Sequence, residues 1–393
     1  MKCTFDREHG SAFWGTRLPP GVRIVHPGWS QRTHASDDDG VMSSPLATLT
    51  RCGLGAAAAG FLACAALAPA AHAANTTLST ELRPTPVSAW SGTIAWSSYD
   101  AAANNYRLVV SRDGGPPQPL AVAPSPAPFD VDLGTNRNGS TYAVYTRCAT
   151  PAAPDDDDRR GTDCDVYRTS VATGVEQHLT SISAPAWDER DPTIMRGEIA
   201  FIRRETHGGT TKDVLRIANT TSGSQGTRQL TKVTVGRSTA LRDPELAANR
   251  VAYVRTGPGF GFGEQQLHTL TLRGLTDRTV YTARSGGANA ANIAGLSVSD
   301  TLKSFVWART NNGSGTGNRL VRLTISNGQL TYAQGSSRYI SSAWASPSLG
   351  AAVSVDGSGT GTCFGNVNDP PSATQCSIQV TGPVTWFASP SLN

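Results

Sequence analysis

The chain has 393 residues, of which 16% are charged and 38% hydrophobic, and its formal net charge is +4. A surplus this small gives no electrostatic basis for nucleic-acid binding, which needs a concentrated basic face. Chains near 300 residues bury roughly 75% of their unfolded surface, so the length suffices for a large core.

The N-terminal part of the sequence is predicted to precede the folded protein. Residues 1–41 show neither helical nor strand periodicity and are interpreted as an upstream extension, disordered or not translated. Residues 42–73 combine one cation, Arg51, with an apolar run and an Ala-His-Ala end, which is typical of a secretory signal peptide cleaved after Ala73. A short segment, 74–84, and a folded region, 85–393, would follow in a secreted or cell-envelope protein. No later apolar run approaches the ~18 residues of a membrane span.

Three strand-like elements recur about every 50 residues in the folded region. The first is a short run such as PVSAWSG, PFDVDLG or DPTIMRG. The third resembles CDVYRTSVATGVEQHLT, in which two alternating runs are joined by a turn. Between them lies an apolar run with a small central residue, which is in turn Ala95, Ala143, Ala200, Ala252, Val306 and Ala352. β-branched and aromatic residues fill these runs and Gly, Asn, Asp and Pro separate them, which indicates strands.

Six units of four short antiparallel strands predict an all-β fold, a six-bladed β-propeller. One blade cannot bury both of its faces alone, so blades must stack radially around a channel. A multi-strand sandwich is the alternative, but it would show shorter turn spacing and no repeat that preserves register. The blade number would change by one if the N-terminal NTTLSTEL contributed a closing strand in another way.

Three segments resemble the blade repeats of TolB-like six-bladed propellers: DVYRTSVATGVEQHLT (165–180), RDPTIMRGEIAFIRR (190–204) and RDPELAANRVAYVRT (242–256). The resemblance covers roughly residues 85–389 and is specific to the blades, not to a function. It does not include the α/β domain that precedes the propeller of TolB, so the partner docking of that protein is not carried over.

Four cysteines follow the predicted leader, Cys148, Cys164, Cys363 and Cys376. An even number in an exported protein suggests disulfides, for which three connectivities exist. The first two cysteines flank the loop between the second and third strands of the second unit, and the last two flank the corresponding loop of the sixth. We therefore predict the pairs Cys148–Cys164 and Cys363–Cys376, each stabilising the fold by about 3 kcal/mol. No histidine accompanies them, so no metal or cofactor is expected.

No catalytic motif stands out, and the chain is predicted to be a binding protein rather than an enzyme. The histidines after the leader, His178, His207 and His268, fall in three different units, and neither G-x-S-x-G nor H-E-x-x-H occurs. The acidic loop at 155–158 lacks the alternating spacing of a calcium loop and is interpreted as solvated. Asp130 and Asp132 alternate along an inner strand, so both are expected to face the channel, mainly in structural hydrogen bonds.

Arginines recur where the second strand of a unit ends, at Arg147, Arg203, Arg204, Arg255 and Arg309. Those ends lie on the same face as the connections between blades, two of which contain RDP at residues 190–192 and 242–244. The repetition predicts a ring of guanidinium groups around one channel mouth, suited to carboxylate, sulfate or phosphate groups. The alternative is that these arginines pair as struts between blades, with Asp165, Asp191, Asp213 and Asp243 as partners.

Aromatic residues accompany this loop-bearing face. The predicted ligand site comprises Arg147, Arg203, Arg255, Arg309, Trp187, Phe260 and Phe262. We therefore hypothesise an exported, monomeric, non-catalytic propeller that binds a protein or an anionic glycan there. A structural scaffold of the cell envelope remains an alternative, as does a hydrolase or lyase with convergent carboxylates at the channel mouth, because propellers host many activities.

Overall fold

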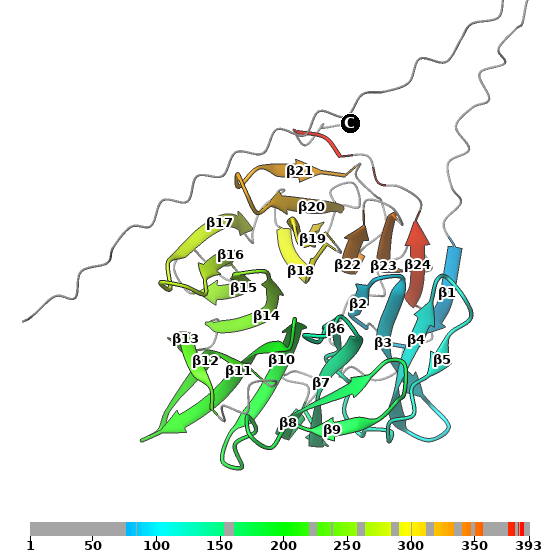
Figure 1. Cartoon of the computed structure of the whole chain (residues 1–393), viewed down its shortest axis with the longest axis horizontal. Coiled ribbons are helices and arrows are strands. Elements are labelled where there is room, and N and C mark those ends of the chain that lie inside the picture. Colours follow the sequence, from blue (N-terminus) through cyan, green and yellow to red (C-terminus); the bar gives the residue numbers. More distant parts are fainter. Residues whose placement is uncertain are drawn as a thin grey trace, which may run out of the picture. The chain divides into compact units, whose positions relative to one another are not determined.

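Antiparallel strands account for the regular structure. The computed structural model describes residues 76–83, 85–152, 161–219, 226–236, 239–257, 264–283, 291–299, 301–311, 318–333, 340–346, 350–356, 376–381, 384 and 386–388. These residues belong to one compact unit, Leu67–Asn393, and form 24 strands in six four-stranded sheets (Figure 1). Within this part of the chain, nothing helical has the length and apolarity to cross a membrane.

Five of the sheets are built from consecutive strands. The first sheet contains β2 (Val87–Trp90), β3 (Thr93–Asp100), β4 (Asn105–Arg112) and β5 (Gln118–Pro119). The second contains β6 (Asp132–Thr135), β7 (Thr141–Pro151), β8 (Gly161–Ser170) and β9 (Glu176–His178). The third contains β10 (Asp188–Met195), β11 (Glu198–His207), β12 (Thr210–Asn219) and β13 (Arg228–Thr234). The fourth contains β14 (Ala240–Ala247), β15 (Arg250–Gly257), β16 (Glu264–Thr271) and β17 (Asp277–Ala283). The fifth contains β18 (Ala291–Val298), β19 (Ser304–Asn311), β20 (Arg319–Thr324) and β21 (Leu330–Tyr332).

The last sheet joins the two ends of the described chain. It contains β22 (Ile340–Ser346), β23 (Gly350–Asp356), β24 (Cys376–Thr381) and, as its outermost strand, β1 (Thr76–Glu81). The N-terminal strand therefore completes a sheet whose other three strands come from the C-terminal part.

Both faces of the first sheet are buried, which explains its apolar second strand. In β3, Ala95 packs into one hydrophobic cluster while its neighbours Ile94 and Trp96 pack into another. Successive side chains of a strand point to opposite faces, so this sheet packs against a neighbour on each side. The central small residues of the next sheets, Ala143, Ala200, Ala252 and Val306, are likewise 0% exposed.

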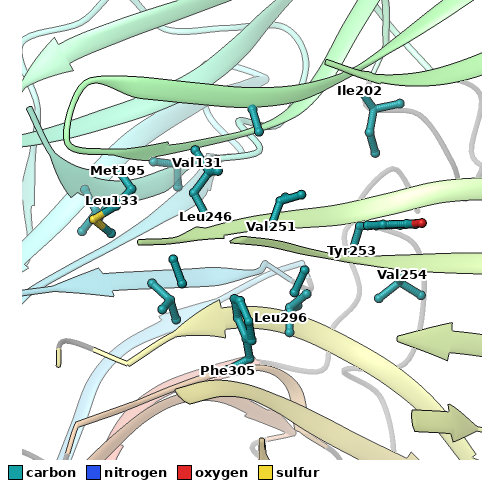
Figure 2. Close-up of a cluster of buried hydrophobic side chains, with 14 of the residues drawn as sticks. Val131, Leu133, Met195, Ile202, Leu246, Val251, Tyr253, Val254, Leu296 and Phe305 are labelled. Atoms are coloured by element: carbon teal, nitrogen blue, oxygen red, sulfur yellow. The ribbon is translucent and has the colours of Figure 1, made fainter. Parts of the chain in front are cut away.

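The first strands of the sheets form a ring. These inner strands (β2, β6, β10, β14, β18 and β22) each contact the next one in chain order, and β22 contacts β2. Figure 2 shows the apolar core beside them, to which Leu133, Met195 and Leu246 contribute from β6, β10 and β14. Four-stranded antiparallel sheets packed face to face around a common ring constitute a β-propeller. The predicted all-β propeller with four-stranded blades is confirmed.

One predicted disulfide is confirmed. Cys148 and Cys164 lie opposite each other on β7 and β8 and are bonded. In the second predicted pair, Cys376 is disulfide-bonded, and Cys363 lies outside the described residues. The predicted upstream extension and signal peptide, residues 1–73, also lie outside them.

The N-terminal strand is anchored by a buried carboxylate at its end. Trp96 Nε1, from the first sheet, donates a hydrogen bond of 2.7 Å to Glu81 Oε1, and Ser98 Oγ donates one of 2.8 Å to Oε2. Trp96 is 0% and Glu81 4% exposed. The carboxylate therefore ties the last sheet, through β1, to the first.

We predict that Glu81→Ala lowers the free energy of unfolding by about 1–3 kcal/mol, because the buried indole N–H loses its acceptor. Thr80→Ala, at an exposed position of the same strand, is the control and should change stability by less than about 0.5 kcal/mol. Urea unfolding followed by tryptophan fluorescence measures both. Equal midpoints for the two variants would contradict the anchoring role.

Candidate functional site: the mouth of the central channel

A chain of hydrogen bonds joins the inner strands around the channel. In four successive steps, a side chain of one inner strand accepts the backbone N–H of the next. The donor and acceptor pairs are Leu133 N to Ser88 Oγ (2.9 Å), Ile194 N to Asp132 Oδ2 (3.1 Å), Leu246 N to Thr193 Oγ1 (3.2 Å) and Val298 N to Glu245 Oε1 (3.0 Å). In the fifth step Ser297 Oγ donates to the carbonyl oxygen of Ala343, at 2.9 Å.

This chain has a simple physical cause. The inner strand lies at the edge of its sheet, so part of its backbone has no neighbouring strand to pair with. Buried backbone N–H groups need acceptors, and here the previous sheet provides them through side chains. Two of these acceptors, Asp132 and Glu245, are carboxylates, and they are only 9% and 5% exposed.

A small cavity lies among the inner strands. It has a volume of about 70 Å³, and five of the six sheets contribute to its lining. Its titratable residues are all acidic: Asp130, Asp132, Asp191, Asp243 and Glu245. Its other lining residues are Pro86, Val87, Ser88, Val131, Pro192, Pro244, Gly295, Leu296 and Ser297, so no basic side chain is among them.

Asp191 and Asp243 reach this cavity from equivalent bulges. Each precedes a proline, and each has a positive φ, 47° and 46°, where the pairing of β10 with β11 and of β14 with β15 shifts by one residue. Gly295 has φ 55° at the equivalent bulge of β18. Asp and Gly tolerate this left-handed conformation, which explains the residue types. The bulge on β10 is fixed further by Asp130, whose Oδ2 accepts the N–H of Asp191 at 2.7 Å.

Burial changes the proton affinity of the inner carboxylates. Burial raises the pKa of Asp132 to about 6, although hydrogen bonds from Ser88, Ile194 and Thr193 oppose the change. Burial also raises the pKa of Glu245 well above its usual range, and the negative charges of Asp132 and Asp243 raise it further. Asp132 and Glu245 therefore retain protons to a higher pH than exposed carboxyl groups do.

The predicted arginines lie elsewhere, and three on the third sheet are buried in ion pairs. Arg203 Nε lies 2.7 Å from Glu189 Oε1, and its NH2 donates to the carbonyl oxygen of Ile182. Asp213 accepts from both Arg190 (2.6 Å) and Arg204 (2.9 Å). Burial alone would raise the pKa of Asp213, but the two guanidinium groups hold it below its usual value.

One of these ion pairs also connects two sheets. Arg190 NH2 donates to the carbonyl oxygen of Leu241 at 2.8 Å, and Asp213 Oδ2 accepts the N–H of Leu241 at 3.1 Å. Both groups belong to the third sheet, whereas Leu241 is in β14 of the fourth. This pair is a strut between sheets, as the alternative interpretation of the arginine repeat predicted.

The remaining predicted ligand residues do not converge on the cavity. Arg147 NH1 and NH2 donate to the carbonyl oxygens of Ala123 and Pro124, and NH1 also pairs with Glu176. Arg255 is exposed, Arg309 and Trp187 are half-buried, and Trp187 packs on His207. Phe260 and Phe262 lie outside the described residues. Of the predicted ligand residues that the structure describes, none lines the channel cavity.

The acidic residues of the site were predicted only in part. Asp130 and Asp132 were expected to face the channel in structural hydrogen bonds, and both line the cavity and accept backbone N–H groups. Asp191 and Asp243 were considered only as partners of arginines, and Glu245 was missed. Aligning the segments DP-T, DP-E and DV-D of successive sheets would have revealed them. The acidic loop at 155–158 lies outside the described residues, and no cluster of three or more metal-ligating side chains occurs within them.

Known structures with a similar course of the chain include several enzymes and enzyme domains. An α-L-arabinanase of Penicillium chrysogenum superposes with a TM-score of 0.47 and 12% identity, over 78% of this chain and 97% of its own. An oligogalacturonate lyase of Vibrio parahaemolyticus gives 0.42 and 9%, over 79% and 98%. The β-propeller domain of the trilobed protease of Pyrococcus furiosus gives 0.37 and 9%, over 70% and 79%.

These likenesses are too distant to carry an activity to this chain. No protein-family model matches the sequence. No curated protein matches it either.

We predict that Arg203→Ala lowers the free energy of unfolding by about 3–5 kcal/mol, because Glu189, which is 0% exposed, would lose its cation. Arg255→Ala, at the equivalent but exposed position of the fourth sheet, is the matched control and should cost less than about 0.5 kcal/mol. Chemical denaturation of both variants measures the difference. Similar small losses would mean that Arg203 is not a strut.

We predict that Asp132→Asn flattens the pH dependence of stability. The folded state holds a proton at Asp132 up to about pH 6, whereas the unfolded chain releases it near pH 4. The stability due to this proton is complete below about pH 4 and is lost as the pH rises through about 6, a difference of roughly 3 kcal/mol. Thermal unfolding from pH 4 to 7 should therefore differ in slope between wild type and variant. Asp113→Asn, at an exposed turn, should retain the wild-type slope.

Proposed function

We propose that the six sheets are the six blades of one propeller and that it is a non-catalytic binding protein. Its ligand site is the channel mouth, and the ligand presents a cationic group. The observation that carries this proposal is the lining of the cavity, which has five carboxylates from three sheets and no basic side chain.

The charge of the cavity argues against the anionic ligand expected from the arginine repeat. An anion at the mouth would lie beside Asp191 and Asp243 without a compensating guanidinium group from the lining. Arg203 and Arg204 are consecutive residues of β11 and leave opposite faces of their sheet, where they pair with Glu189 and Asp213. A cation would be attracted, and by stabilising the ionised carboxylates it would also displace protons from them.

The size of the cavity restricts the ligand. About 70 Å³ holds a few water molecules, since one water needs roughly 10–15 Å³ of this accessible volume, and it is far below the ~300 Å³ at which small-molecule pockets begin. An ammonium head on a flexible stem fits these dimensions, and a sugar ring does not. A lysine side chain or a terminal amine of a protein partner is therefore favoured over a glycan.

The position of the cavity suits a macromolecular partner. Asp130 and Asp132 lie at the start of β6, where the connection from the first sheet arrives, and Asp191 and Asp243 lie at bulges within β10 and β14. The segments around the mouth would then contact the rest of the partner, while the cavity receives one basic side chain. Export through the predicted signal peptide would place this partner outside the cytoplasm.

We predict that a short lysine-containing peptide binds the full, oxidised chain and that the same peptide with acetylated lysine binds at least about tenfold more weakly. The double variant Asp191→Asn, Asp243→Asn should lose binding to a similar extent. Asn tolerates positive φ as Asp does, so the bulges should persist. Affinity should rise between pH 5 and pH 8 as Asp132 ionises, and titration calorimetry measures all of these.

Asp113→Asn provides the matched control, because Asp113 also has a positive φ, 50°, but lies at an exposed hairpin turn. It should bind the peptide as wild type does. Equal binding of the acetylated peptide, or unchanged binding by the double variant, would contradict the proposal.

A second candidate function is hydrolysis by paired carboxylates. Its support is the raised pKa of Asp132 and Glu245 beside other acidic groups, since a protonated and an ionised carboxyl together can act as acid and base. The backbone hydrogen bonds that occupy Asp132 and Glu245 favour a structural role instead. Release of acetate from a small acetyl ester by wild type, but not by Asp243→Asn, would establish this alternative.

A further inference from the structure

A second, larger cavity lies at the C-terminal ends of two inner strands, β6 and β10. Its volume is about 410 Å³, within the range of small-molecule pockets. It lies where β6 turns into β7, where β10 turns into β11, and where β12 ends. The lining residues are Thr135, Asn136, Arg137, Gly139, Arg196, Glu198 and Asn219. The second and third sheets thus build it together.

Hydrogen bonds fix the two hairpins against each other at the base of this cavity. Thr135 Oγ1 accepts the N–H of Arg196 at 3.3 Å, and the carbonyl oxygen of Thr135 accepts the N–H of Gly197 at 3.0 Å. Within the other hairpin, Asn136 N donates to the carbonyl oxygen of Ser140 at 2.9 Å. The cavity is therefore held by backbone contacts between two sheets.

Two arginines from different sheets line this cavity. Arg137 and Arg196 are both exposed, and neither forms an ion pair with the described part of the chain. This distinguishes them from Arg190, Arg203 and Arg204, whose charges are neutralised by buried carboxylates. Both guanidinium groups are therefore free to bind an anion from solution.

The turn itself does not require an arginine at position 196. Arg196 has φ 52° and Gly197 has φ 79°, the geometry of a tight hairpin in which Asn-Gly is preferred. The corresponding turns of other sheets have Ser91 and Ala248 with φ 47° and 52°. Positive φ is unfavourable for a long side chain, so the guanidinium group, not the backbone, explains the arginine.

We infer that this cavity binds a carboxylate-bearing sugar, a uronate unit. Two guanidinium groups suit one carboxylate, which Arg binds through paired hydrogen bonds. The side-chain amides of Asn136 and Asn219 and the carboxylate of Glu198 provide donors and acceptors for sugar hydroxyl groups. The volume accommodates a sugar ring, which the channel cavity does not. This cavity and the channel cavity have no lining residue in common, so either can be tested without the other.

The experiment titrates the full, oxidised chain with a uronate trisaccharide and with its methyl-esterified, neutral form. The acid form should bind at least about tenfold more tightly than the ester. Arg196→Asn should weaken binding by a similar factor without lowering the unfolding temperature, because Asn suits the turn better than Arg. Arg137→Gln should weaken it likewise, whereas Arg278→Gln, at an exposed position on β17, should not.

Three outcomes would overturn the inference. Equal binding of the ester would mean that the carboxylate is not recognised. Unchanged binding by Arg196→Asn and Arg137→Gln would place the sugar elsewhere. Full displacement of the trisaccharide by an equal concentration of inorganic sulfate would identify a site for simple anions, not for a sugar.

Discussion

The rest of the structure depends on how the inner strands satisfy their channel-facing backbone. Each inner strand lacks a neighbour on one side, and its buried N–H groups need acceptors. Ser88, Asp132, Thr193 and Glu245 provide them, each from the sheet before. This sequence of bonds sets the angular position of each sheet relative to the next. It also requires polar side chains at the centre of an otherwise apolar core.

The acidity of the channel follows from that requirement. A carboxylate accepts hydrogen bonds from N–H groups well. Asp132 and Glu245 lose hydration when they are buried in this role, and the loss raises the pKa of both carboxyl groups. Asp191 and Asp243 are added by the bulges within β10 and β14. The basic residues of the same region, Arg190, Arg203 and Arg204, pair with Glu189 and Asp213 and do not line the cavity. The cavity therefore contains carboxylates without a neighbouring guanidinium group in its lining.

The sequence predicted the sheets well because their signal is local. A run such as TIAWSSY is apolar on both faces. Only a strand whose sheet packs against another sheet on each face needs that pattern. The Cys148–Cys164 pair followed from the same repeat. The direction of a side chain after a bulge has no such periodic signal, so Asp191 and Asp243 were not placed at the channel. The arginines were misleading for another reason: whether a guanidinium group meets a ligand or a strut depends on a partner such as Asp213, which lies in a different strand from Arg190.

The pairing of β1 with β24 has a consequence for the order of assembly. Thr76–Glu81 is synthesised before the other described strands, yet its partner Cys376–Thr381 is synthesised almost last. The ring cannot close until nearly the whole chain is present, and contacts of such long sequence separation form slowly. Until then, β1 is an unpaired strand edge, a feature prone to pairing with other chains. The hydrogen bond from Trp96 to Glu81 offers this strand an early local partner only fifteen residues away, before its sheet exists.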